Sequence, residues 1–216
     1  MGCLMYFRAT RSNITFAVNL LSRFMHYASE LHFQATKKIV RYIKGAINCS
    51  IKFSHLHNFM LYDYFDNNWA GFVDDIKSTT SYCFSFGSRM FSWCLRKQDV
   101  IAQSTAEIEY IAAITAVNQA IWIKKILVDL HMDQLEPTRI YVDNQTAISF
   151  ANNHVFHCKI RHFKIKLYFF REVQKEGDVI QLSCRTNDQI VDVLTKALSK
   201  ANFEELKSKL GVCRCH

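Results

Sequence analysis

One stretch of the sequence, residues 58–66, limits the fold more than any other. It reads Asn-Phe-Met-Leu-Tyr-Asp-Tyr-Phe before Asp66, and the polar residues Asn67 and Asn68 follow. Aromatic and aliphatic residues favour a strand, and polar turn residues typically end one. Carboxylates at such strand ends hold metal ions in phosphate chemistry. We therefore predict that Asp66 lies at a sheet edge, where three later acids complete one metal site. These acids are Glu109, Asp143 and Asp192.

The next segments indicate sequential antiparallel strands. A short extended piece at residues 50–53 precedes the strand at 59–66, and further strands are predicted at 80–86 and 90–95. Gly87-Ser88-Arg89 between the last two is typical of a tight hairpin.

A long helix is predicted from about residue 106 to 130. Glu109, Ala113, Ala116 and Ala120 fall on one narrow face of it, and small residues let a helix lie close to a sheet. A carboxylate on that face points toward the sheet, which is unusual unless it is paired or bound to metal.

Residues 139–184 are predicted to alternate strands and helices. Residues 139–142 form a short apolar strand closed by Asp143, and residues 144–152 indicate a short helix. A helix at 165–175 and a strand at 178–184 follow. A long helix followed by a strand begins an α/β arrangement. The ordinary alternative for Asp143 is a helix N-cap.

The last predicted acid, Asp192, lies on a helix whose start we place at Thr186, because Thr186 and Gln189 fit a capping box. Lys196 follows Asp192 at i+4, so the alternative for this acid is a surface ion pair worth a few tenths of a kcal/mol. A final amphipathic helix is predicted at 201–210.

The N-terminal quarter is predicted to be helical, at residues 14–24 with Ser12-Asn13 as N-cap, and at 32–47. The second helix carries a cationic stripe opposite an apolar face. The stripe is Lys37, Arg41 and Lys44, and the apolar face is Ala35, Ile39, Tyr42 and Ile43. Such a helix can follow a phosphate backbone, or it can be an ordinary amphipathic surface helix.

The charge is uneven along the chain. Of the net charge of +8, residues 1–60 supply eight Lys and Arg against the single acid Glu30, whereas the remainder is nearly balanced. A basic segment favours a polyanionic partner, although a solvated basic face without a ligand is the alternative.

Several protein classes fit poorly. We find no secretory signal and no apolar run long enough for a bilayer, so we expect an intracellular protein with no membrane partner. The eight cysteines lack Cys-x-x-Cys spacing and are expected to be reduced, with no disulfide partner. Two clusters contain zinc-ligand residue types but no second matched pair, which makes them weak candidates. They are His154, His157, Cys158 and His162, and Cys213, Cys215 and His216.

Motifs along essentially the whole chain resemble the C-terminal part of the Pol polyprotein of copia-type LTR retrotransposons, the plant type in particular. The first ones, which resemble the end of the reverse transcriptase, are Gly2-Cys3-Leu4-Met5-Tyr6, Leu21-Ser22-Arg23-Phe24 and Arg41-Tyr42-Ile43-Lys44-Gly45. Those that resemble the ribonuclease H domain are Asp66-x-x-Trp69-Ala70-Gly71, Ser104-Thr105-Ala106-Glu107-x-Glu109-Tyr110, Tyr141-x-Asp143-Asn144-Gln145, Arg161-His162 and Asp192-x-Leu194-Thr195-Lys196.

The resemblance implies an α/β fold, a ribonuclease H-like mixed five-stranded sheet with helices on both faces, preceded by a small helical remnant of the reverse transcriptase. The implied domains are residues 1–56 (the remnant), 57–198 (ribonuclease H-like) and 199–216 (C-terminal helix and tail). The implied catalytic acids and metal ligands are the same four, Asp66, Glu109, Asp143 and Asp192.

The implied reaction is hydrolysis of the RNA strand in an RNA–DNA hybrid with two Mg²⁺ ions, or Mn²⁺ in their place. Another implied partner is the reverse transcriptase palm and fingers region. Nucleic acid would contact Lys37, Arg41, Lys44, Asn144, Gln145, His157, Arg161 and His162.

The chain departs from the family pattern at five positions, none of them a catalytic acid. Asn68 replaces an acid, Ser81 a Gly, Lys164 an Asp, and Ser12 and Ala197 each a Pro. The polymerase motif Tyr-x-Asp-Asp is absent, so we expect no polymerase activity. The alternative function is therefore an inactive, truncated remnant that binds nucleic acid without cleaving it.

Overall fold

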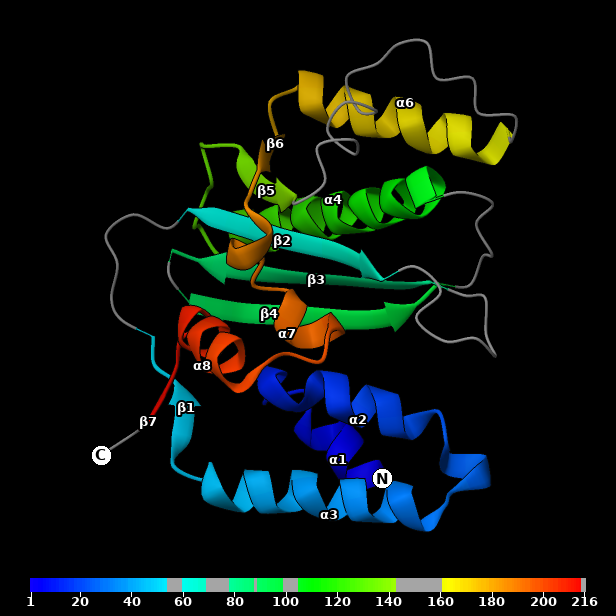
Figure 1. Cartoon of the computed structure of the whole chain (residues 1–216). Helices are drawn as coiled ribbons and strands as arrows, with labels where there is room; N and C mark the ends of the chain where they lie inside the picture. Colours follow the sequence, from blue (N-terminus) through cyan, green and yellow to red (C-terminus); the bar gives the residue numbers. More distant parts are fainter. Residues whose placement is uncertain (54–59, 69–77, 88, 99–104, 143–160, 215–216) are drawn as a thin grey trace.

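The computed structural model describes residues 1–53, 60–68, 78–87, 89–98, 105–142 and 161–214 (Figure 1). Five strands form the central sheet, in the order β4-β3-β2-β5-β6. They are β2 (Leu61–Asn68), β3 (Thr79–Phe86), β4 (Arg89–Lys97), β5 (Thr138–Val142) and β6 (Val179–Ser183).

The sheet is mixed. β2, β3 and β4 pair antiparallel, as the sequential strands and the hairpin predicted, and Gly87 adopts a positive φ of 56° at the turn. β5 pairs parallel with β2 and β6 pairs parallel with β5. The parallel pairs need crossover connections, and the long helix after β4 supplies one of them. The predicted mixed five-stranded sheet with helices on both faces is confirmed.

One face of the sheet is covered by α4 (Thr105–Asp129) and α6 (Arg161–Lys175). Ala112, Ala116 and Ala120 of α4 are fully buried in a cluster that includes Phe65 and Ile140 of the sheet. The small alanine side chains let the helix approach the strands closely, as the sequence predicted.

The segment Ile111–Asp129 within α4 is long and apolar enough, by composition, to cross a membrane. The expectation that no such run exists was therefore wrong. In this fold eight of its side chains between Ala112 and Leu127 are buried in the core under the sheet, whereas Trp122 is 57% exposed. A buried core helix meets the same criterion of length and composition.

The opposite face of the sheet is covered by η3 (Thr186–Asp188), α7 (Asp192–Thr195) and α8 (Lys200–Lys209). Leu194 and Leu210 pack there with Cys83 and Met90 of the sheet. The chain then forms β7 (Val212–Arg214), which pairs antiparallel with β1 (Cys49–Ile51). The sequence did not predict this second, two-stranded sheet, because its strands are three residues each and far apart in the chain.

The N-terminal segment (residues 1–53) contains five helical elements and β1. The helical elements are α1 (Gly2–Phe7), η1 (Ser12–Ile14), α2 (Thr15–Ser22), η2 (Met25–Tyr27) and α3 (Glu30–Gly45). They enclose a small core that includes Leu4, Val18 and Ile39. The segment also contacts the sheet, since the Trp93 indole nitrogen donates to the Arg8 carbonyl at 3.0 Å. In Figure 1, α2 lies beside α7, and the two helices are in contact.

Two predicted helix N-caps were wrong, and α6 begins at Arg161, four residues before its predicted start. Ser12 and Asn13 do not cap α2, because they form a buried 3₁₀ turn in which the Asn13 amide donates to the Tyr42 hydroxyl at 2.7 Å. Thr186 does not open the helix of Asp192, because residues 186–188 are a separate 3₁₀ turn and the Gln189 side chain bonds the Phe65 carbonyl instead of a helix end.

Candidate active site

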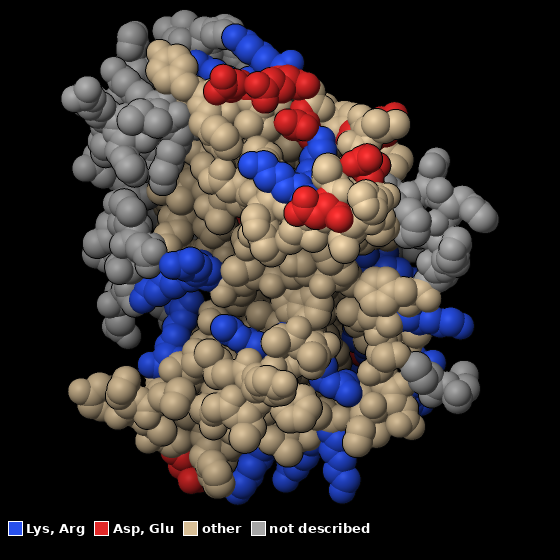
Figure 2. Space-filling view, turned by 180° about the vertical axis from the view of Figure 1, so that it is seen from behind, with Lys and Arg blue, Asp and Glu red and all other residues tan. Residues whose placement is uncertain are grey.

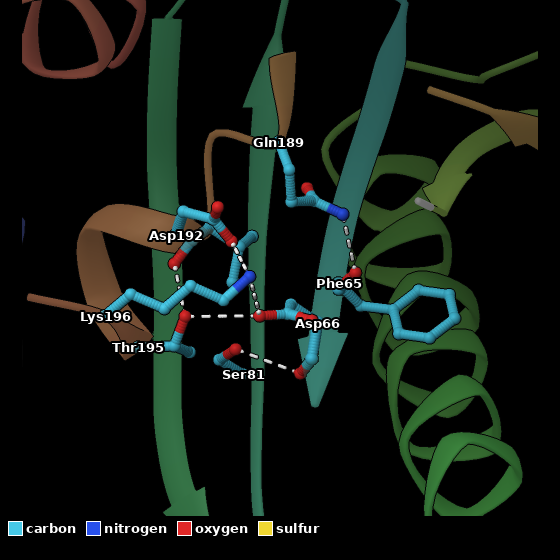
Figure 3. Close-up of polar contacts among 8 residues, drawn as sticks. Phe65, Asp66, Ser81, Gln189, Asp192, Thr195 and Lys196 are labelled. Carbon is cyan, nitrogen blue, oxygen red and sulfur yellow. Dashed lines mark hydrogen bonds and ion pairs between the residues drawn. The ribbon is translucent and has the colours of Figure 1, made fainter. Parts of the chain in front are cut away.

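Asp66 and Asp192 are brought together on the sheet face that α7 covers (Figure 3). Asp66 lies near the end of β2, and Asp192 is the first residue of α7. The expectation that the strand ends at Asp66 was wrong, because Asn67 and Asn68 still pair with Thr80 and Thr79 of β3. Both are buried, at 7% and 6% exposure. Alternation along β2 sends Asp66 to this face and Phe65 to the face under α4, since successive side chains of a strand point to opposite sides.

One cation joins the two acids. The Lys196 Nζ lies 2.7 Å from Asp192 Oδ1 and 3.3 Å from Asp66 Oδ2. Burial by itself would lower the pKa of Lys196, but its hydrogen bonds and its attraction to Asp192 and Asp66 outweigh that effect and raise the pKa above 10.5. The i+4 pair that the sequence offered as an ordinary surface ion pair is therefore part of a three-residue cluster with a buried acid on each side.

Three polar side chains hold this cluster in place. Thr195 Oγ1 donates to Asp66 Oδ2 at 3.2 Å, and Ser81 Oγ donates to the Asp66 carbonyl at 3.0 Å. Gln189 Nε2 donates to the Phe65 carbonyl at 2.9 Å. The parallel pairing of β2 with β5 ends at Tyr64, so Gln189 ties the chain before α7 to the next carbonyl of β2.

Replacing Gln189 by Met is expected to lower the free energy of unfolding by about 1–3 kcal/mol, because it leaves the buried Phe65 carbonyl without this donor. Chemical denaturation checks this value. The same change at Gln134, whose bond to the Met132 carbonyl is exposed and 3.4 Å long, should stay within about 0.5 kcal/mol. Equal effects at the two positions would contradict a role for Gln189 in holding the strand.

The other two predicted acids are only partly placed. Glu109 falls within α4, whose alanine face packs on the sheet, but its side chain is outside the described residues. Asp143 follows β5 and lies outside them altogether, as does the predicted helix at 144–152. Within the described residues, no group of three or more His, Cys, Asp or Glu could hold a metal ion.

Some of the predicted nucleic-acid contacts lie outside the described residues, and others are placed by the structure. Asn144, Gln145 and His157 are outside the described residues, and Arg161 and His162 begin α6 without described side chains. The stripe of Lys37, Arg41 and Lys44 is present and exposed on α3, and Ile39 on the opposite side is buried, as predicted.

Figure 2 shows where charge gathers on one side of the molecule. Acidic side chains cluster in its upper part, and basic ones dominate its lower part, where Figure 1 places the N-terminal helices. The basic character of residues 1–60 in the sequence is thus carried to the surface.

The zinc candidates stay predictions. His154, His157 and Cys158 are outside the described residues, as are Cys215 and His216. Cys213 lies in β7, where its thiol contacts the Ser50 carbonyl at 3.6 Å.

The described donors fit a divalent ion such as Mg²⁺. Carboxylate oxygens are the ligands Mg²⁺ prefers, and it is usually bound by one or two carboxylates that leave room for waters and substrate phosphate. Asp66 and Asp192 already share one cationic group, so their oxygens converge closely enough to share a cation. Glu109 and Asp143 are the acids we expect to add to this pair.

Sequence reasoning missed the supporting residues. Nothing local indicates that Gln189 bonds a strand, because its partner is 124 residues away in the chain. Thr195 carries a weak signal, since it lies three residues after Asp192 and therefore one helical turn away. Asp63, a fully buried acid on the other face of β2, was also missed within a run that was interpreted as apolar.

Comparison with known proteins supplies relatives for the whole chain. The chain is 37% identical, over 214 residues and 99% of its length, to the retrovirus-related Pol polyprotein from transposon RE1 of Arabidopsis thaliana. It is 34% identical, over 98% of its length, to that from transposon TNT 1-94 of Nicotiana tabacum. The chain spans only 15% and 16% of the length of these two relatives. No protein-family model matches the sequence.

Among solved structures, the fold is similar to LC11-RNase H1 isolated from compost, with a TM-score of 0.46 and 13% identity. The similarity covers 69% of this chain and 93% of that one.

Proposed function

This chain belongs to the retrovirus-related Pol polyproteins of plant transposons, and from that premise we propose that it is a metal-dependent ribonuclease H that cleaves RNA in RNA–DNA hybrids. The observation that carries the proposal is the meeting of Asp66 and Asp192. They come from a strand and a helix 126 positions apart, both are buried, and both contact the same ammonium group. Burying two acids side by side is costly unless a cation is held between them.

In the proposed mechanism the four acids would hold two Mg²⁺ ions, or Mn²⁺, whose chemistry when bound would be to activate a water and neutralise charge on the phosphate. Asp66 and Asp192 would hold the ions together with Glu109 and Asp143. Thr195 keeps the Asp66 carboxylate oriented through its hydroxyl, and Ser81 fixes the backbone at the same residue. Gln189 anchors the segment before α7, which keeps Asp192 near the strand.

We propose that the substrate is bound through its backbone and shape, because a ribonuclease H distinguishes the RNA strand by its 2′-hydroxyls and not by base sequence. The exposed Lys37, Arg41 and Lys44 on α3 supply positive charge for the phosphates. The further proposed contacts are Asn144, Gln145, His157, Arg161 and His162.

The division of the chain into residues 1–56, 57–198 and 199–216 is likewise a proposal. In this division, residues 1–56 derive from the reverse transcriptase. We propose that, besides the RNA–DNA hybrid, they bind the palm and fingers region of that enzyme. The large apolar side chains exposed on this part are consistent with such a partner. They include Tyr6, Tyr27, Leu31 and Ile47.

The experiment that tests the function is cleavage of an RNA–DNA hybrid labelled on each strand in turn, with Mg²⁺ or Mn²⁺. We expect cuts within the RNA strand alone, no cleavage of the matching DNA duplex, and complete loss of activity in EDTA. Cleavage of the DNA duplex at the same rate would contradict the proposal.

A second candidate function is binding without cleavage, which the exposed cationic stripe on α3 favours. It predicts that the hybrid binds without being cut and that affinity falls steeply with salt, because each neutralised phosphate releases counterions. Replacing Lys37, Arg41 and Lys44 by Gln would then reduce the salt dependence and leave the fold intact.

A further inference from the structure

Lys196 occupies the position between the two described acids that a shared metal ion would need. Its Nζ is 2.7 Å from Asp192 Oδ1 and 3.3 Å from Asp66 Oδ2, so it touches one oxygen of each carboxylate (Figure 3). A metal ion bound to the same two oxygens would lie within about 5 Å of the ammonium, since Mg²⁺ sits about 2.0–2.1 Å from its ligands, so the two cations would repel each other and compete for the site.

The arrangement balances charge inside a buried site. Two carboxylates this close repel each other, and their burial makes that repulsion stronger than in water. Thr195 donates only one hydrogen bond to Asp66 and supplies no charge. Lys196 brings a positive charge into contact with both acids.

The lysine is also able to leave. Its side chain is 36% exposed, whereas those of Asp66 and Asp192 are 8% and 9% exposed. Lys196 also borders a cavity of about 290 Å³ between the N-terminal helices and α7, lined in part by Ile14 and Ile39. A flexible four-carbon stem beside open space can swing out without repacking the core.

We propose that Lys196 is a positioning residue that serves as the counter-ion of the metal-free site. Its ammonium holds Asp66 and Asp192 in place before a divalent ion binds, and it is displaced when the ion binds. This inference rests on the proposed function for the identity of the ion. Beyond that function, the inference is that Lys196 weakens the affinity of the site for the metal ion, because its ammonium must be displaced, while it keeps Asp66 and Asp192 in place before the ion binds.

The test compares Mg²⁺ binding and metal-free stability in Lys196 variants of the full chain. In Lys196→Met we expect the Mg²⁺ dissociation constant, measured by titration calorimetry, to fall about tenfold or more, because a close competing positive charge is gone. In EDTA the same variant should melt at least about 2–4 °C lower than the wild type. Saturating Mg²⁺ should restore that loss.

Two further variants separate charge from packing. Lys196→Gln keeps a hydrogen-bond donor without the charge and should also bind Mg²⁺ more tightly, which keeps the test valid if Lys196→Met does not fold. Lys196→Arg keeps the charge and should retain both the wild-type Tm in EDTA and the weak affinity. The matched control is Lys209→Met, which removes only exposed ion pairs with Asp188 and Glu205 and should change neither quantity.

The proposal is wrong if the uncharged variants bind Mg²⁺ no more tightly than the wild type, or if no variant binds it. These results are distinct from failure of the proposed function. Tighter Mg²⁺ binding without hybrid cleavage would support the counter-ion role and reject the nuclease, and cleavage with unchanged Mg²⁺ affinity would do the reverse.

Discussion

Replacing Asp66 by Asn is expected to reduce cleavage of RNA in an RNA–DNA hybrid by more than about a hundredfold while the protein stays folded. Even residues that only support a metal ligand cost about 10–100-fold when mutated, and Asp66 is expected to be a ligand itself. The change removes one charge and keeps the shape. The rate of hybrid cleavage at saturating Mg²⁺ measures the loss.

The fold should survive the substitution because the two side chains that contact the Asp66 carboxylate, those of Thr195 and Lys196, each keep a polar contact. An Asn side-chain oxygen can still accept the Thr195 hydroxyl, and Lys196 keeps its 2.7 Å contact with Asp192. The matched control is Asp188→Asn, which alters an exposed acid paired with Lys209 and should leave the rate unchanged. A folded Asp66→Asn protein that cleaves at the wild-type rate would remove Asp66 from the proposed catalytic set.

Replacing Asp63 by Val is expected to raise the free energy of unfolding by about 1–3 kcal/mol at neutral pH. Asp63 is fully buried on β2, opposite Phe84 of β3 and Ile140 of β5, which are both fully buried as well. Within the described residues neither of its carboxyl oxygens has a partner with full hydrogen-bond geometry, although the Tyr64 backbone lies close enough to favour the charged form in part. Val fills a similar space and favours strands, so the unpaired polar group disappears without a new cavity.

The stability of the wild type should therefore depend on pH in a way that Asp63→Asn removes. Burial raises the pKa of Asp63 well above its ordinary value of 3.8, and the backbone at Tyr64 offsets only part of the rise. The folded protein thus keeps a proton that the unfolded chain loses near pH 4. Its stability relative to the Asn variant is greatest below that pH and falls as pH rises toward the folded pKa, by up to about 1.4 kcal/mol per pH unit.

Denaturant unfolding of the wild type, Asp63→Asn and Asp63→Val at pH 4, 5.5 and 7 would measure both effects. Asp133→Asn, at an exposed position, is the control and should change stability by no more than about 0.5 kcal/mol at neutral pH. A wild type that gains stability relative to Asp63→Asn as pH rises would mean that the carboxyl is ionised and paired in the folded protein.

The order of the elements was predictable because it depends on short-range periodicity. The run of aromatic and aliphatic residues in β2, the alanine face of α4 and the cationic stripe of α3 are all visible within a few residues, so neighbouring positions carry the signal. The helix starts at Ser12 and Thr186 failed for a related reason. Polar residues that resemble caps were used for tertiary contacts, and local patterns do not distinguish the two uses.

By itself the sequence determined the strands and the long helix, but not where the acids stand in them, since β2 runs two residues past Asp66 and Asp192 opens α7 instead of lying inside a longer helix. Only the tertiary structure decided that Lys196 joins Asp66 to Asp192, that Gln189 bonds the Phe65 carbonyl and that β7 pairs with β1. It also decided that Asp63 is fully buried. These contacts, and that burial, depend on how distant elements pack and on strand register, whereas periodicity fixes only which side of an element faces the core.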